Sequence, residues 1–158
     1  MSSASRAAEA VTRLILDVFR ANGALLAAGD RLVADLGLTS ARWQVLGAVA
    51  MAEAPLSVAG IARAMGLTRQ AVQRVADDLE RAGHVRFAPN PHHQRSKLVL
   101  LTPQGEAAYR AAAERQGPWA EALAQDLDPA ALALAAEVLR AVSRRLAETS
   151  PANQEAGS

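Results

Sequence analysis

The stretch SVAGIARAMGLTRQAVQRVADDLERAGHV, residues 57–85, decides the fold. Ser57 precedes a short run of periodic apolar residues that ends at Gly66, and Thr68 precedes a longer run that ends at Gly83. Serine and threonine are favoured N-caps of helices, and glycine is favoured directly after a last helical turn. The segment therefore predicts two helices joined by a tight turn.

The pattern changes directly after these helices. Apolar and polar residues alternate in HVRFA (84–88) and return in KLVLL (97–101), with the polar loop PNPHHQRS (89–96) between them. Alternation is the period of a strand, and proline with small polar residues favours turns. We expect a two-stranded β-hairpin with a long tip.

Amphipathic helices are predicted on both sides of this unit. Val11, Val18, Leu25 and Leu32 recur every seventh residue in a first helix over about 7–36, which Gly37 should end. Gly23 and Gly29 should weaken or bend it. A second helix should start at Thr39 or Ser40 and end near Pro55.

Two further helices are predicted after the hairpin. Thr102 and Pro103 form a helix start, because proline at the first helical position loses no needed hydrogen bond. Gly117 and Pro118 should kink or split that helix, and Asp128 with Pro129 should start the last one. The tail, residues 149–158, has little to bury and is expected to be disordered.

The composition favours a mainly α protein and excludes several kinds of chemistry. Of the 158 residues 51% are apolar and only 3% aromatic, and there is no cysteine. Disulfides, thiolate metal sites and thiol-based redox sensing are therefore excluded. No apolar run approaches the roughly 20 residues that cross a bilayer, so we expect a cytoplasmic protein. The length suits one domain, or one domain with helices that complete their core against a second copy.

Positive charge is concentrated in the middle of the chain. Residues 57–102 hold six Arg and one Lys against three acids, whereas the first third is neutral and the last third is acidic. His84, His92 and His93 lie there too and could add charge on protonation. Three acidic residues come late in the second helix of the pair, where we expect them to lie farther from phosphates. These residues are Asp77, Asp78 and Glu80. A basic segment alone is more often a solvated face than a nucleic-acid site.

The outward face of the second helix of the pair nevertheless suits DNA. In a helix-turn-helix the second helix lies in the major groove, with its N-terminal residues facing base edges. Arginine can bind guanine, glutamine can pair with adenine, and threonine can bind a phosphate or a thymine methyl. The residues opposite the apolar stripe are Thr68, Arg69, Gln70, Gln73 and Arg74.

The order of elements resembles a known family. LTSARWQVLGAVA (38–50), LTRQAVQRVADDLERAGHV (67–85) and NPHHQRSKLVLLTPQGEAAY (90–109) are similar to segments of the MarR (multiple antibiotic resistance regulator) family. The similarity covers about residues 7–148. It implies a mainly α fold with a small β-hairpin wing, in which a winged helix-turn-helix DNA-binding lobe (39–102) joins a helical dimerisation layer (7–37 and 103–148).

The resemblance also implies a function. A member of this family is expected to be an obligate homodimer that binds a palindromic double-stranded DNA operator as a transcriptional repressor, often relieved by a small anionic or aromatic effector. No cofactor is expected. The operator sequence, the target genes and the identity of any effector are not readable from one sequence.

The wing departs from the family pattern. This chain has Asn90, His92, His93 and Gln94 where Asp, Arg, Asp and Arg are frequent, and it keeps Arg95. Arg95 is therefore the predicted minor-groove contact and Lys97 a phosphate contact. The missing acids could be replaced by hydrogen bonds, or by histidines that make binding pH-sensitive. The full predicted DNA-binding set is Ser57, Thr68, Arg69, Gln70, Gln73, Arg74, His92, His93, Arg95 and Lys97.

Several residues of the sequence allow further interpretations. The pair His92 and His93 has no Cys, Asp or Glu nearby and is not expected to bind a metal. An effector pocket could include Phe19, Arg20, Asn22, Trp43, Tyr109 and Trp119, although each aromatic is more often a core or interface residue. An enzyme is not expected, because no catalytic motif or phosphate loop is present. The stronger rival is a winged-helix module that binds protein rather than DNA.

Overall fold

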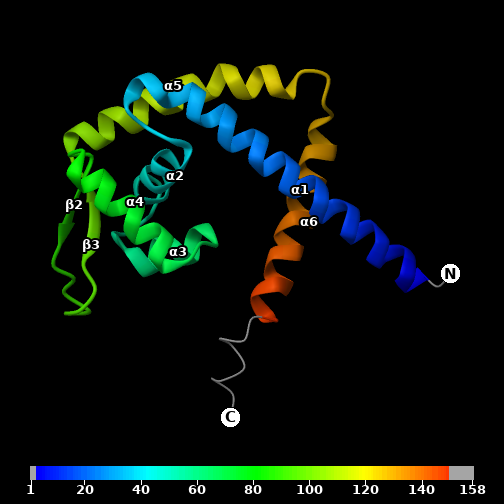
Figure 1. Ribbon diagram of the computed structural model, residues 1–158, viewed down its shortest axis with the longest axis horizontal. Helices are drawn as coiled ribbons and strands as arrows, with labels where there is room; N and C mark the ends of the chain where they lie inside the picture. Colours follow the sequence, from blue (N-terminus) through cyan, green and yellow to red (C-terminus); the bar gives the residue numbers. More distant parts are fainter. Residues whose placement is uncertain (1–2, 150–158) are drawn as a thin grey trace, which may run out of the picture. The chain divides into compact units, whose positions relative to one another are not determined.

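The long N-terminal helix ends where the sequence predicts. The computed structural model describes residues 3–149, and its first helix, α1, runs over Ser3–Val33 without a break (Figure 1). A 3₁₀ turn, η1, follows over Ala34–Leu36. Gly37 then takes the left-handed conformation with φ 69°, which glycine adopts without steric cost. The predicted C-cap is confirmed.

Gly29 has a packing role that the helical period does not reveal. A Cβ at this position would collide with Oγ of Ser40, the first residue of helix α2 (Ser40–Ala50). The Ser40 hydroxyl donates to the Leu26 carbonyl at 2.7 Å, and the Ser40 N–H donates to Oδ1 of Asp30 at 2.7 Å. The missing side chain at position 29 therefore lets α2 begin directly against α1.

The predicted helix pair is present, with the predicted caps. Helix α3 covers Val58–Met65 and helix α4 covers Arg69–Arg81. The Ser57 hydroxyl accepts from the Gly60 N–H at 3.2 Å, and the Thr68 hydroxyl accepts from the Ala71 N–H at 3.1 Å. Thr39 caps α2 in the same way through the Arg42 N–H, also at 3.2 Å. Each cap satisfies one backbone donor that the first helical turn leaves open.

The wing is part of a three-stranded sheet, so the prediction of two strands is incomplete. Strands β2 (Val85–Ala88) and β3 (Leu98–Leu101) pair antiparallel, as the alternating pattern predicts. A two-residue strand, β1 (Leu56–Ser57), pairs with the other edge of β3. The order is β1-β3-β2. Two residues are too few to show alternation, which is why the sequence did not reveal β1.

The core lies between α2, α3, α4 and the sheet. Val72, Ala76 and Leu79 of α4 are fully buried, so the apolar stripe of this helix lies in the core, and Val75 packs at its edge. Leu46 of α2, Ile61 of α3 and Val99 of β3 are fully buried beside them. This core fixes which face of α4 points outward.

The C-terminal helices are α5 (Pro103–Ala124) and α6 (Pro129–Glu148). Helix α5 continues through Pro118, so the alternative that it splits there is wrong. Asp128 caps α6 through the Ala130 N–H at 3.1 Å, as predicted. Of the tail predicted to be disordered, Thr149 is the C-cap of α6, and residues 150–158 lie outside the described part.

The chain divides into two compact units, one up to Gly117 and one from Pro118. The first contains α1 to β3 and most of α5, and the second contains the end of α5 and α6. Within residues 3–149 no helix is both long enough and apolar enough to span a bilayer.

Candidate nucleic-acid interface

The outward face of α4 consists of the polar residues that the sequence predicts for base reading. Thr68, at the N-cap, is exposed, and its hydroxyl oxygen holds the Ala71 N–H while its own proton remains available as a donor. Arg69, Gln70, Gln73 and Arg74 are exposed as well, opposite the buried stripe of the same helix. The core therefore holds these side chains on one accessible surface.

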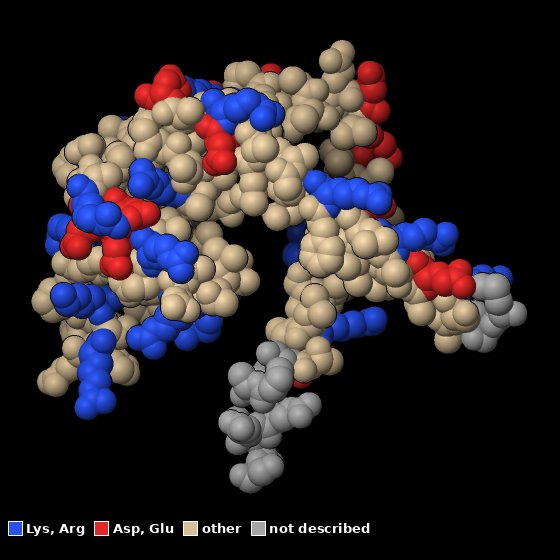
Figure 2. All heavy atoms as spheres, in the orientation of Figure 1, with Lys and Arg blue, Asp and Glu red and all other residues tan. Residues whose placement is uncertain are grey.

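Positive side chains gather on this part of the molecule. Figure 2 shows blue Lys and Arg side chains over the region that Figure 1 labels α3, α4, β2 and β3. Among the residues that the structure describes, the side chains of Arg69, Arg74, Arg95 and Lys97 form no ion pair or hydrogen bond. Unpaired cations on one face attract a polyanion without first breaking internal contacts.

Two other arginines of the lobe, Arg42 and Arg81, are already paired. Arg81 binds Asp78 of the same helix, and Arg42 of α2 lies 3.8 Å from the second carboxylate oxygen of Asp78. Asp78 therefore joins α2 to α4 and neutralises cations away from the open face. This pairing is consistent with the expectation that Asp78 lies apart from the phosphates.

Asp77 does not follow that expectation. It lies in a shallow surface depression together with Arg69, Gln70, Gln73 and Arg74. The Gln73 side-chain amide donates from Nε2 to Oδ1 of Asp77 at 2.7 Å. The sequence did not place Asp77 at this surface, although a glutamine and an aspartate four residues apart on a helix can form a hydrogen-bonded pair.

A groove of about 340 Å³ separates α4 from the wing. The arginine and lysine of the wing face it from one side, and polar residues of α4 face it from the other. Ser57, the N-cap of α3, is half-buried. The lining residues are Val58, Ala59, Arg69, Gln73, Asp77, Glu80, Phe87, Arg95, Ser96 and Lys97. The groove brings residues from both parts of the predicted DNA-binding set together.

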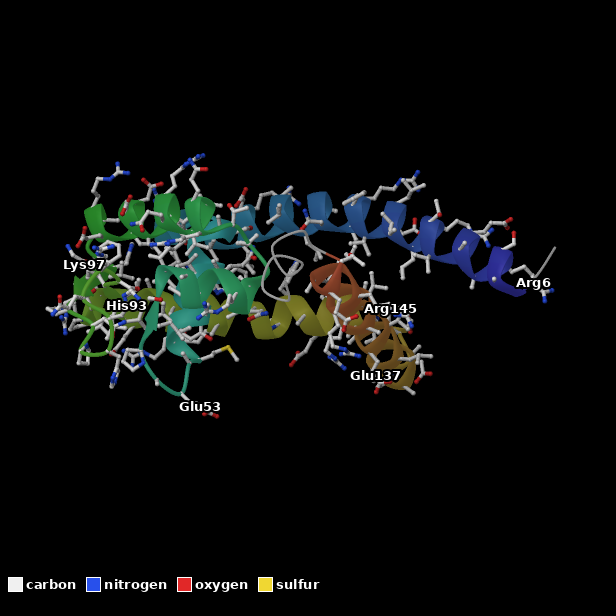
Figure 3. The ribbon with its side chains drawn as sticks, turned by 90° about the horizontal axis from the view of Figure 1, so that it is seen from below. Arg6, Glu53, His93, Lys97, Glu137 and Arg145 are labelled. Atoms are coloured by element: carbon white, nitrogen blue, oxygen red, sulfur yellow. The ribbon has the colours of Figure 1, made fainter. Side chains whose placement is uncertain are left out.

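The tip of the wing is shaped by hydrogen bonds around Asn90. The Asn90 side chain accepts from the His92 N–H at 2.9 Å, and the Asn90 carbonyl accepts from the His93 N–H at 3.2 Å. The side chains of His92, His93, Arg95 and Lys97 are exposed, and Figure 3 labels His93 and Lys97 on the hairpin. In residues 3–149 no group of three or more His, Cys, Asp or Glu side chains could hold a metal ion.

His84 does not contribute to this surface. Its side chain is only 6% exposed, and its Nδ1 is buried without a hydrogen-bond partner among the described residues. Burial lowers the pKa of His84, and the positive charge of Arg42 lowers it further. The expectation that His84 could add charge to the basic segment is therefore wrong, because the protein disfavours its charged form.

The predicted effector residues lie in several different places. Phe19, Arg20 and Asn22 are exposed on α1, where Arg20 lies 3.5 Å from Asp17. Trp43 and Tyr109 are half-buried against the core of the first unit, and Trp119 is half-buried in the second unit. The Tyr109 ring lies against Gly47 of α2. Trp43 and Tyr109 thus take part in packing.

A comparison with known sequences identifies the lobe. A sequence model described as the MarR family matches residues 36–96, from the end of η1 through the wing. The chain belongs to the MarR family. The resemblance seen in the sequence is thereby confirmed.

Known protein sequences match over more of the chain. An uncharacterized protein of Mycobacterium tuberculosis, Rv2011c, is 41% identical over 130 residues, which are 82% of this chain and 90% of that protein. The transcriptional activatory protein BadR of Rhodopseudomonas palustris is 32% identical over 108 residues, which are 67% of this chain and 62% of BadR.

Solved structures of MarR-family regulators share the fold. The apo form of MarR from Escherichia coli superposes with a TM-score of 0.66 at 25% identity, covering 83% of this chain and 95% of that one. CouR from Rhodococcus jostii, solved with p-coumaroyl-CoA bound, has a TM-score of 0.71 at 21% identity, covering 80% of this chain and 88% of CouR. The family fold therefore extends beyond the winged lobe.

Proposed function

We propose that this protein is a sequence-specific double-stranded DNA-binding transcriptional regulator. One observation carries the proposal: the exposed arginine and glutamine face of α4 lies beside the unpaired Arg95 and Lys97 of the wing. A helix of this kind reads the major groove, while a wing cation can reach the adjacent minor groove or phosphates. The remaining members of the predicted set, Ser57, Thr68, His92 and His93, then contact phosphates or sugars. Such a protein acts where the chromosome lies, in the cytoplasm.

The regulator is proposed to bind as a homodimer. Large apolar side chains are exposed along α1, including Ile15, Val18 and Leu25, and along α6, including Leu139 and Leu146. Exposed apolar stripes of this extent are unusual on a monomer and suit burial against a second copy. A two-fold dimer presents two copies of α4, so its operator should be palindromic with half-sites about 10 bp apart.

We further propose that the dimer represses transcription and that a small anionic or aromatic molecule relieves repression. CouR was solved with p-coumaroyl-CoA bound, which supports an effector of that class for a protein of this fold. BadR is named an activator, so a promoter-fusion reporter in cells with and without the gene decides the direction. Higher expression without the gene supports repression.

The rival function, a winged-helix module that binds protein, fits the surface less well. Protein-docking helices present aromatic or aliphatic anchors. No large apolar side chain is exposed on α4 among the described residues, and the nearest one, Leu67, precedes the helix. Catalysis is not proposed, since this surface holds no nucleophile paired with a base.

Selection from random duplex DNA tests the proposal. The full-length protein is incubated with a pool of random 30-bp duplexes, and bound molecules are sequenced after several rounds. We expect an enriched palindrome with half-sites about 10 bp apart. A matched control carries Gln70→Ala and Gln73→Ala, which should lose the enriched bases but keep weak binding. Failure of the wild-type protein to enrich any sequence would contradict the proposed function.

A further inference from the structure

The hydrogen bond between Gln73 and Asp77 bears on which base Gln73 can read. Among the predicted base-reading residues of the described chain, Gln73 is the one whose side chain is already held by another side chain. Its amide donates from Nε2 to the Asp77 carboxylate at 2.7 Å. A carboxylate can only accept, so it must face the NH₂ end of the amide and not the carbonyl end.

This contact fixes the polarity of the amide. A free glutamine side chain can turn over and present either end, but here the NH₂ group lies beside Asp77 and the carbonyl oxygen Oε1 points away from it. One N–H and one carbonyl oxygen remain free. That arrangement matches adenine, which offers the N6 amino donor and the N7 acceptor in the major groove.

Guanine fits the fixed amide poorly. It offers two acceptors, O6 and N7, so the outward Oε1 of Gln73 would face another acceptor. A freely rotating amide could avoid this clash by turning its NH₂ group toward O6. Because Asp77 holds the amide, this rotation requires loss of the 2.7 Å hydrogen bond between Gln73 and Asp77.

The negative charge of Asp77 has a second consequence. Asp77 lies in the surface depression with Arg69 and Arg74 and lines the groove that Arg95 and Lys97 face. A carboxylate at this position repels phosphates and weakens binding to every DNA sequence equally. The charge effect and the positioning effect can therefore be separated, because only the second depends on which base is present.

On the basis of the function proposed above, we propose that Asp77 is a positioning residue for specificity: it holds Gln73 in the orientation that selects adenine over guanine. The pair is fixed before DNA arrives, so little side-chain entropy is lost on recognition. Asp77 itself need not touch a base.

Two substitutions at position 77 separate these effects. Asp77→Ala removes both the charge and the acceptor, whereas Asp77→Asn removes the charge and replaces an acceptor-only group with an amide that can accept from Nε2 or donate to Oε1 of Gln73. The probe is the palindrome selected by the wild-type protein, made with A·T or G·C at the base pair that Gln73→Ala identifies. Circular dichroism melting checks that each variant is folded.

The expected result is specific. A good bidentate contact discriminates by about 1 to 3 kcal/mol, so the wild-type protein should prefer adenine by roughly 5-fold to 150-fold at that position. Asp77→Ala and Asp77→Asn should both lower this preference several-fold, because neither side chain fixes which end of the Gln73 amide faces outward. Both variants should bind random duplex more tightly than the wild type. In the double variant with Gln73→Ala, Asp77→Ala should change the preference no further.

An unchanged adenine preference in Asp77→Ala would overturn the inference while leaving the proposed function intact. An adenine preference that Asp77→Asn keeps in full would also overturn it, because an amide at position 77 can hold either end of the Gln73 side chain. If the wild-type protein shows no base preference at all, the proposed function fails and this inference fails with it.

Discussion

The main-chain carbonyl of His84 occupies the place where a side chain at Gly105 would begin. This close approach joins the base of the wing to the first turn of α5. Thr102 completes the joint, since its hydroxyl donates to the Gly83 carbonyl at 2.6 Å and accepts from the Gly105 N–H at 3.0 Å. The position of the wing relative to the start of α5 therefore depends on a residue without a side chain.

Substituting Gly105 by alanine should destabilise the protein. The new Cβ would collide with a backbone atom that cannot rotate away, so the net cost should be about 1 to 3 kcal/mol despite the better helix propensity of alanine. Urea denaturation measures the change. Gly23→Ala is the matched control, because a Cβ at position 23 of α1 meets nothing within 4 Å. It should stabilise the protein by about 0.5 to 1 kcal/mol. Equal stability of the two variants would contradict the packing argument.

This joint illustrates what the sequence could and could not reveal. Helix starts were predictable because Thr39, Ser57, Thr68 and Asp128 satisfy backbone donors locally. The packing roles of Gly29 and Gly105 were not, because each depends on a residue from another element. Local sequence signals predict where helices begin. Close contacts between residues of different elements give no such local signal.

Some features of the candidate site could be predicted from the sequence and others could not. The open face of α4 followed from helical periodicity, since burying one stripe exposes the opposite one. The burial of His84 could not be read from a residue type that is common both inside and outside proteins. The spacing of four between Gln73 and Asp77 permits their hydrogen bond, but the position of Asp77 late in the helix does not show that its carboxylate reaches the open face.

The stability of the protein should fall as the pH is lowered from 7.5 to 5.5. The pKa of His84 is lowered by burial and by Arg42, so the unfolded chain binds a proton at a higher pH than the folded chain does. Stability linked to His84 is thus present above about pH 6.5, the unfolded pKa of histidine, and is lost as the pH falls through the lower folded pKa.

Thermal melts at pH 7.5 and pH 5.5 measure the difference in stability. His84→Leu should flatten this dependence, and the exposed-site control His93→Asn should retain it. A wild-type protein equally stable at both values would refute the assignment.

The Asp35 carboxyl should titrate below its usual range. Arg115 of α5 donates to both carboxylate oxygens of Asp35 and also to the Leu32 carbonyl, at 3.1 Å. The hydrogen bond from Arg115 lowers the pKa of Asp35, although desolvation opposes it. Because the folded pKa is depressed, the stability linked to Asp35 is present above about pH 4 and is lost as the pH falls further.

Carboxyl-detected NMR titration measures this pKa directly. Arg115→Gln should return the Asp35 titration toward the ordinary range of an aspartate. Arg110→Gln, at an exposed arginine of the same helix, should leave it unchanged. An Asp35 titration that Arg115→Gln does not move would show that the pair does not form in solution.

Substituting Ile15 by glutamate should dissociate the proposed dimer. Ile15 is 38% exposed on α1 and lies on the same stripe as Val11 and Val18. A carboxylate buried in an apolar interface carries a desolvation cost of several kcal/mol, which would raise the dimer dissociation constant by at least 100-fold. Sedimentation equilibrium measures the constant. Arg13→Glu adds a carboxylate about 200° around the same helix and should leave the dimer intact. A monomeric wild-type protein would refute the dimer.

Removing the Arg95 side chain should weaken DNA binding without changing base preference in the α4 half-site. Arg95 lines the groove beside α4 and forms no ion pair within the described residues, so its charge is available to phosphates or to the minor groove. Each cation that neutralises a phosphate contributes about 0.9 to the slope of log affinity against log salt. A dimer has two copies, so Arg95→Ala should reduce the magnitude of that slope by up to about 2.

Arg86→Ala is the matched control, because Arg86 comes from β2 but lines a different groove with Leu100 and Glu106. Fluorescence anisotropy titrations between 50 and 200 mM salt measure both slopes. If the two variants lower the slope equally, the wing has no special contact with DNA, and general positive charge is sufficient to explain binding.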